Sequence, residues 1–169
     1  REIYAKCILF DYSYKYFYSD GYGKDYQILN LEEQDDDTQH LYLVASLLSF
    51  YQQQLAWVEN RRSFAPYGIE RPLWVFVGGS VTKTLTTHES SDVIAILRFL
   101  SRFLDNADES APPLDRLLSG TTGLTYKGRD VFASTFGYLV RHGERGRELY
   151  RRVVNSVFRA GGKLRIEEL

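Results

Sequence analysis

Residues 73–80, Leu-Trp-Val-Phe-Val-Gly-Gly-Ser, join an unbroken apolar run to a pair of glycines. A short apolar run rich in valine is typical of a strand that is covered on both faces. Strands of that kind occur in parallel sheets with helices packed on either side. The segment therefore predicts an α/β layered fold in which Leu73–Val77 is an inner strand.

The chain before this run predicts a β-hairpin followed by a long helix. Ile3–Tyr18 and Tyr26–Leu31 are rich in Tyr, Phe and Ile, and glycines stand in the turn between them. Thr38–Asn60 follows an acidic stretch suited to a helix start, and its apolar residues predict a buried first half. Arg61–Arg71 contains a proline and a glycine and is expected to be a loop.

Helices are expected to dominate the final third of the chain. A helix that begins at Ser90 or Ser91 and runs to Leu104 would place four apolar residues on one side, at Val93, Ile96, Leu97 and Leu100. The other expectations are a break at Asn106–Pro113, a helical turn at Leu114–Leu118, irregular structure at Ser119–Asp130, and helices at Val131–Arg141 and Glu144–Ala160 with Gly143 between them.

Composition indicates a globular protein, because 44% of the 169 residues are hydrophobic and 25% are charged. The single cysteine, Cys7, excludes an internal disulfide and fits a reducing cytosol. The most apolar stretch, Leu41–Tyr51, is far shorter than the ~20 residues that a membrane span needs. The chain begins with Arg1 and contains no methionine, which indicates an internal piece of a longer protein.

Charge is distributed unevenly, although the net charge is only -1. Residues 1–60 carry 4 basic and 10 acidic groups, whereas residues 141–165 carry 8 basic and 2 acidic groups. Arg145, Arg152 and Arg159 recur every seven residues, which would align them as a basic stripe on a continuous helix. The stripe indicates an anionic partner such as a nucleic acid, with an ordinary solvated helix face as the alternative.

The loop Val77–Thr84 has the sequence Val-Gly-Gly-Ser-Val-Thr-Lys-Thr. Its glycines permit close approach of the backbone, and its amides, hydroxyls and single lysine can hold a phosphate. It is not a Walker A loop, since no glycine precedes Lys83. The alternatives are therefore an ordinary turn after a strand, or contact with the phosphate of a nucleotide or a nucleic acid.

No set of catalytic, cofactor-binding or metal-ligating residues is recognisable in the sequence. His40, His88 and His142 lie far apart and lack metal-ligand spacing. The tyrosine-rich segment Tyr16–Asp25 contains Lys24 and is a candidate for stacking on nucleotides, although such tyrosines more often pack one face of a sheet.

Several segments together resemble the middle of DEAD/DEAH-box helicases of superfamily 2, specifically the Res subunit of type III restriction enzymes. The aromatic turn and the apolar run with its glycines are the most distinctive of them. In chain order the segments are YKYFYSDGYGKDYQILNL, YLVASLLSFYQQQ, RPLWVFVGGSVTKT, SDVIAILRFLSRFL, LLSGTTGLTYKGRDVFASTFGYLV and GGKLRIEEL.

The resemblance implies the junction of two RecA-like motor domains. Residues 1–60 would be the end of the first domain with a crossover hairpin and helix, 61–72 a linker, and 73–169 the start of the second domain with a helical insertion. The loop after Val77 would follow helicase motif IV and touch the DNA backbone. The resemblance assigns that contact to Gly79, Ser80, Thr82 and Lys83.

The chain departs from the family because it has no Walker A loop, no DEAH box and no late motif with an arginine finger. ATP and Mg²⁺ would therefore bind elsewhere in the parent motor, and no cofactor and no ATPase activity are expected of this chain alone. The resemblance implies a bacterial cytoplasmic protein that acts on DNA in phage defence, with a methyltransferase subunit as a possible second partner. Self-association through the apolar Leu73–Val77 segment is also expected.

Two alternatives remain open at the level of the sequence. The first is a non-enzymatic α/β module that binds nucleic acid or another subunit through the arginine stripe and the 78–84 loop. The second is a small stand-alone α/β enzyme that uses the loop for a nucleotide, which is disfavoured because no acid, base or nucleophile is placed for chemistry.

Overall fold

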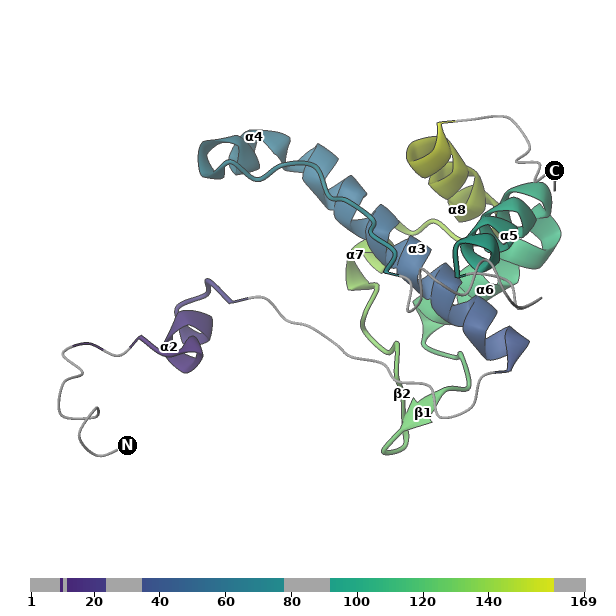
Figure 1. Ribbon diagram of the computed structural model, residues 1–169, viewed down its shortest axis with the longest axis horizontal. Coiled ribbons are helices and arrows are strands. Elements are labelled where there is room, and N and C mark those ends of the chain that lie inside the picture. The colour runs from purple at the N-terminus through teal and green to yellow at the C-terminus, as the bar shows by residue number, and fades with distance from the viewer. Residues whose placement is uncertain (1–9, 11, 24–34, 78–91, 160–169) are drawn as a thin grey trace, which may run out of the picture. The chain divides into compact units, whose positions relative to one another are not determined.

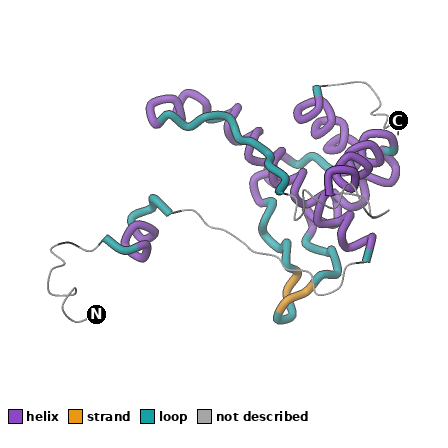
Figure 2. The backbone as a smooth tube through the Cα atoms, viewed as in Figure 1, coloured by secondary structure: helices purple, strands orange, loops and turns teal. Residues whose placement is uncertain are grey.

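The computed structural model describes residues 10, 12–23, 35–77 and 92–159 of the chain. The chain divides into two compact units, Arg1–Gln34 and Asp35–Leu169, and each is described here by itself. The described residues are mostly helical, and their strands form one small antiparallel sheet (Figure 2). The parallel sheet of a RecA-like layer is not among them.

The described part of the first unit contains one short helix, α2 (Tyr14–Ser19). The expected hairpin strand is therefore wrong over these residues, while the rest of that hairpin, Ile3–Leu9 and Tyr26–Leu31, lies outside the described residues. Rings at helical spacing contact each other, with the Tyr14 centroid 6.0 Å from that of Tyr18. Such i, i+4 aromatic contacts stabilise a helical turn as readily as alternating rings suit a strand.

The second unit is built on α3 (Asp36–Glu59), which confirms the long helix expected from the sequence. Asp35 caps it by accepting a hydrogen bond from the Thr38 amide at 2.7 Å. Its first half is buried, as expected, and its far end continues into α4 (Arg61–Phe64) and η1 (Ala65–Tyr67), away from the other helices of this unit (Figure 1). The buried apolar residues of α3 are Leu41, Val44, Ala45, Leu47, Leu48 and Tyr51.

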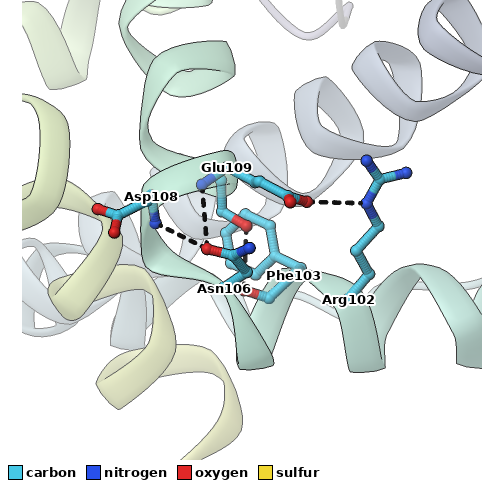
Figure 3. Close-up of polar contacts among 6 residues, drawn as sticks. Arg102, Phe103, Asn106, Asp108 and Glu109 are labelled. Carbon is cyan, nitrogen blue, oxygen red and sulfur yellow. Dashed lines mark hydrogen bonds and ion pairs between the residues drawn. The ribbon is translucent and has the colours of Figure 1, made fainter.

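Helices α5 (Asp92–Asp105) and α6 (Ala107–Ser119) meet at Asn106, where the chain turns sharply (Figure 3). The Asn106 side chain accepts hydrogen bonds from the amides of Asp108 and Glu109 at 3.2 and 3.3 Å and so caps α6. Arg102 joins Glu109 across the turn at 3.2 Å. The helix expected up to Leu104 is confirmed, and its predicted start at Ser90 or Ser91 lies outside the described residues.

The apolar side of α5 differs from the one expected. Its buried residues are Phe99 and Phe103, whereas Val93 is 63% and Leu97 is 37% exposed. The hydrophobic face therefore turns toward the two phenylalanines, which bury more area than the aliphatic positions could.

The break expected at Asn106–Pro113 is wrong beyond Asn106, because α6 runs through Pro112 and Pro113. Both prolines lie in its first two turns, where they remove only the hydrogen bonds to the carbonyls of Asp108 and Glu109. The apolar face of α6 offsets that loss by packing against α3, α5 and α8. Its buried residues are Ser110, Ala111, Leu114, Leu117 and Leu118.

The remaining helices complete the core around α6. They are α7 (Gly137–His142), α8 (Gly146–Val153) and the π-helix η3 (Val154–Phe158), so both expected helices are present only in part. Gly143 ends α7 with a positive φ of 75°, as expected of a glycine between helices. Phe132, Phe136, Leu139, Leu149, Tyr150 and Val153 add the buried side chains of this part.

The segment Ser119–Asp130, expected to be irregular, contains the sheet. Strands β1 (Thr125–Tyr126) and β2 (Arg129–Asp130) pair antiparallel around Lys127 and Gly128, whose φ angles are 50° and 75°. Two positive φ angles in a two-residue loop are those of a type I′ hairpin turn. Strands of two residues show no alternation of apolar and polar positions, so the sequence pattern did not reveal them.

The doubly buried strand expected at Leu73–Val77 is wrong for the described chain. Residues 71–77 have no regular secondary structure, and Leu73, Val75 and Val77 are 85%, 69% and 91% exposed. Trp74 instead lies on α3, with its ring 5.7 Å from that of Phe50. The apolar run correctly shows that the segment carries apolar side chains that could be buried. No described element of this chain covers Leu73, Val75 or Val77.

Within the described ranges, no helix is both long enough and apolar enough to cross a membrane.

Candidate nucleic-acid interface

The loop assigned to the DNA backbone lies outside the described residues. This applies to Gly79, Ser80, Thr82 and Lys83 alike, so their role stays a prediction. The described chain leads up to the loop at Val77, which is 91% exposed. The three arginines of the expected stripe, by contrast, are all described and all exposed.

Arg145 stands immediately before α8 in an extended conformation, with φ -148° and ψ 163°. The following residue, Gly146, donates its amide to the Asp115 carboxylate at 2.8 Å, which ties the start of α8 to α6. No described carboxylate pairs with the Arg145 guanidinium. The Asp115 contact therefore fixes the backbone beside a cation that is free to meet an external anion.

Arg152 lies on α8 but is already engaged. Its guanidinium is 2.5 Å from the carboxylate of Glu144, whose side chain is only 12% exposed. A less exposed ion pair is screened less by solvent than an open one, so Glu144 offsets most of the charge that Arg152 would offer to a phosphate.

Arg159 follows the π-helix η3 and has a left-handed backbone with φ 51°. The seven-residue recurrence assumed one continuous α-helix from Glu144 to Ala160, whereas α8 ends at Val153. A π turn advances fewer degrees per residue than an α turn, so seven residues no longer return to the same face. The three arginines therefore lie on a shared stretch of chain, but not on one α-helical stripe.

Two further arginines of α8 were missed because only the seven-residue spacing was considered. Arg147 forms an ion pair with Asp108 of α6, and Arg151 is exposed with no ion-pair partner among the described residues. The buried Leu149, Tyr150 and Val153 define the inner face of α8. A helical wheel anchored on those three residues would have placed Arg147 and Arg151 on the outside.

The described histidines do not add a catalytic or metal site. Burial, followed by the nearby charge of Arg102, lowers the pKa of His40, which packs edge-on to Phe99. His142 is 3.4 Å from the Glu59 carboxylate, which also accepts a hydrogen bond from the Tyr138 hydroxyl. Among the residues that the structure describes, no group of three His, Cys, Asp or Glu side chains is placed to hold a metal ion.

Comparison with known proteins adds no family. No protein-family model matches the chain, and no curated protein or solved structure matches it either. The likeness to helicases therefore rests on the sequence segments alone.

Proposed function

We propose that this chain contributes DNA-backbone contacts to an ATP-dependent helicase or translocase of a type III restriction system. Two lines of support are independent of each other: the ordered sequence segments that resemble the Res subunit, and the arginines around α8. In this proposal ATP and Mg²⁺ bind elsewhere in the parent motor, and this chain performs no phosphoryl transfer.

The observation that carries the proposal is the set of unpaired cations at Arg145, Arg151 and Arg159. All three are exposed and have no ion-pair partner within the described ranges. Guanidinium groups bind phosphate oxygens through charge-assisted hydrogen bonds, and such contacts position a protein on DNA without reading its bases. We therefore expect binding that depends strongly on salt and little on sequence.

We also propose a RecA-like layered arrangement for the parent protein, in which Leu73–Val77, irregular in this chain by itself, pairs as a strand with another part of the parent. The support is the alternation of Leu73, Val75 and Val77, which are exposed, with Trp74, which packs on α3. The described backbone of residues 71–77 makes no backbone hydrogen bond to other described residues, so its groups are available to a neighbouring strand.

A salt titration of DNA binding tests the proposal directly. The affinity of the chain for a DNA duplex is measured over a series of salt concentrations, for the wild type, for Lys83→Ala and for the triple variant R145A/R152A/R159A. Each phosphate contact that is lost lowers the slope of log affinity against log salt by about 0.9. The matched control is R61A/R62A/R71A, which removes three exposed cations of the same unit that lie outside α8.

Of the three arginines replaced, Arg145 and Arg159 have no described ion-pair partner, and they should account for most of the affinity lost in the triple variant. Among single variants, Arg152→Ala is expected to weaken binding least, because Glu144 already pairs with that guanidinium. Equal losses of DNA affinity in the triple variant and in the control would show that binding depends on net charge and not on a contact at α8. Wild-type chain that fails to bind DNA at low salt would contradict the proposal.

A second candidate is a non-enzymatic module that binds nucleic acid or another subunit. It is favoured by the compactness of Asp35–Leu169, in which α3, α5, α6, α7 and α8 close a common core. Lys83 tests the motor, which requires that Lys83→Ala weaken binding. Loss of binding only with the arginine variant would contradict the motor and leave the module, bound through its arginines alone. A methyltransferase subunit as partner belongs to the motor proposal alone.

A further inference from the structure

The β1–β2 hairpin presents an aromatic ring and two cations to solvent. Tyr126 is 67% exposed, and Lys127 and Arg129 are exposed beside it. The Lys127 ammonium lies 5.2 Å from the centre of the Tyr126 ring, so it covers at most one face of that ring. Figure 1 shows the hairpin projecting from the helices of the second unit, Asp35–Leu169, at the edge opposite α8; this unit is called the helical unit below.

The register of the two strands places the ring and one cation on the same face. Tyr126 pairs with Arg129, and Thr125 pairs with Asp130. Residues directly opposite each other in an antiparallel pair point to the same side of the sheet, and successive residues alternate. The phenol of Tyr126 and the guanidinium of Arg129 therefore share one face, and the only carboxylate of the hairpin is on the other.

That carboxylate is turned into the base of the hairpin. Asp130 accepts hydrogen bonds from the amide and the hydroxyl of Thr122, both at 2.7 Å, and from the Phe132 amide at 2.9 Å. Thr122 is buried, and its carbonyl accepts a hydrogen bond from Arg116 of α6. These contacts hold the base of the hairpin to the helical unit, and they leave the tip without an acidic side chain.

We propose that the β1–β2 hairpin is a binding site for single-stranded nucleic acid, with Tyr126 as a stacking platform for one unpaired base. Lys127 and Arg129 supply the phosphate contacts on either side of that base. An exposed ring flanked by cations is the combination by which proteins bind single strands without reading their sequence. The site is distinct from the α8 arginines and does not depend on the role proposed for them.

A single strand fits this site better than a duplex does. The bases of a duplex are stacked on one another and offer no free face to a tyrosine ring, whereas an unpaired base exposes both faces. The hairpin is short and has one ring, so one stacked base with its neighbouring phosphates matches its size.

The test measures binding of an oligothymidylate and of a DNA duplex to the whole chain. Tyr126→Ala should weaken binding of the single strand roughly tenfold, which corresponds to one stacked base. Tyr126→Phe keeps the ring and should stay within about twofold of the wild type, because the stack and not the hydroxyl carries the contact. The matched control is Tyr67→Ala, which removes another tyrosine that is 80% exposed.

Charge is tested separately with Lys127→Asn and Arg129→Ala. Asparagine tolerates the positive φ of position 127, so the first variant removes the ammonium without straining the turn. Each should lower the salt slope for the single strand by about 0.7. Thermal unfolding of every variant confirms that the helical unit is intact.

Three results would overturn the proposal: no binding of the single strand at low salt, equal affinities for wild type and Tyr126→Ala, or equal losses with Tyr67→Ala. The same variants separate it from the function proposed above. If R145A/R152A/R159A leaves duplex binding unchanged while Tyr126→Ala still weakens the single strand, the α8 interface is wrong and the hairpin site stands.

Discussion

The Trp74 indole donates a hydrogen bond from Nε1 to the Ser46 hydroxyl at 3.0 Å, across 28 positions of the chain. With the ring stacked on Phe50 of the same helix, this bond fixes one side of the apolar run to α3. The other side, formed by Leu73, Val75 and Val77, is left in solvent. A single tryptophan therefore anchors the segment, and its neighbours stay available for another surface.

Removal of the Ser46 hydroxyl should weaken the attachment of Trp74 to α3. In a Trp57→Phe background, Trp74 is the only tryptophan of the chain, so its fluorescence reports the segment alone. Ser46→Ala removes a partly solvated hydrogen bond of about 0.5–1 kcal/mol, and the indole should become more accessible to acrylamide quenching. Ser49→Ala on the same helix is the control. Equal quenching in both variants would show that the ring contacts alone hold Trp74.

The exposed side of the same segment should drive self-association. Alternating apolar residues on an extended segment with free backbone groups are prone to pair with another chain. Replacement of Leu73, Val75 and Val77 by threonine keeps the shape of the two valines and lowers the apolar area at all three positions, so the chain should shift toward the monomer in light scattering. Val58→Thr, at a residue of α3 that is 61% exposed, is the control. A wild-type chain that is monomeric at high concentration would contradict the prediction.

Asp130 should make the stability of the helical unit depend on pH at its acidic end. Burial favours the neutral acid, but hydrogen bonds from Thr122 and Phe132 prevail and lower the pKa of Asp130. The folded pKa is thus below the unfolded value of about 3.9, so the stabilisation is fully present above that pH. It is lost as the pH falls through the folded pKa.

The comparison of wild type with Asp130→Asn tests this dependence. At neutral pH the variant should be less stable by about 1–2 kcal/mol, the worth of charge-assisted hydrogen bonds at a partly exposed group. The gap should narrow as the pH falls below about 3.9, where the wild-type carboxylate also becomes protonated. Asp105→Asn, at an exposed carboxylate without a hydrogen bond in the described structure, should show no comparable change. A constant gap in thermal unfolding across the acidic range would refute the assignment.

The sequence predicted elements whose determinants are local. The helix α3 was expected because Asp and Thr residues near 35–38 favour a helix start and the segment after them is apolar nearly all round up to Tyr51. The continuous helix α6 was not, because Pro112 and Pro113 indicate a break unless the packing that surrounds them is known. Leu73–Val77 has the composition of an inner strand, but composition cannot reveal which element, if any, covers it.

The candidate site was predictable to a similar extent. The excess of basic residues at the end of the chain correctly indicated exposed arginines, but their pairing was not accessible from spacing. Glu144 engages Arg152, and the π turn of η3 removes Arg159 from the expected stripe. The hairpin around Lys127 gave no periodic signal, and its exposed ring and cations emerged only from the strand register.

Gly146 links the fold to the α8 interface, and its replacement should affect both. Its φ of 53° is unfavourable for a residue with a side chain, and a Cβ atom there would lie 3.3 Å from the Asp115 carboxylate. Gly146→Ala should therefore destabilise the unit by about 1–2 kcal/mol in thermal unfolding. Gly137→Ala is the control, because it has an ordinary φ and open space around it, and helix propensity makes that change neutral or stabilising.

Because the Asp115 contact positions the backbone beside Arg145, Gly146→Ala should also weaken DNA binding at temperatures where the chain is still folded, and Gly137→Ala should not. Destabilisation without any change in DNA binding would show that Arg145 does not need this support, or does not contact DNA.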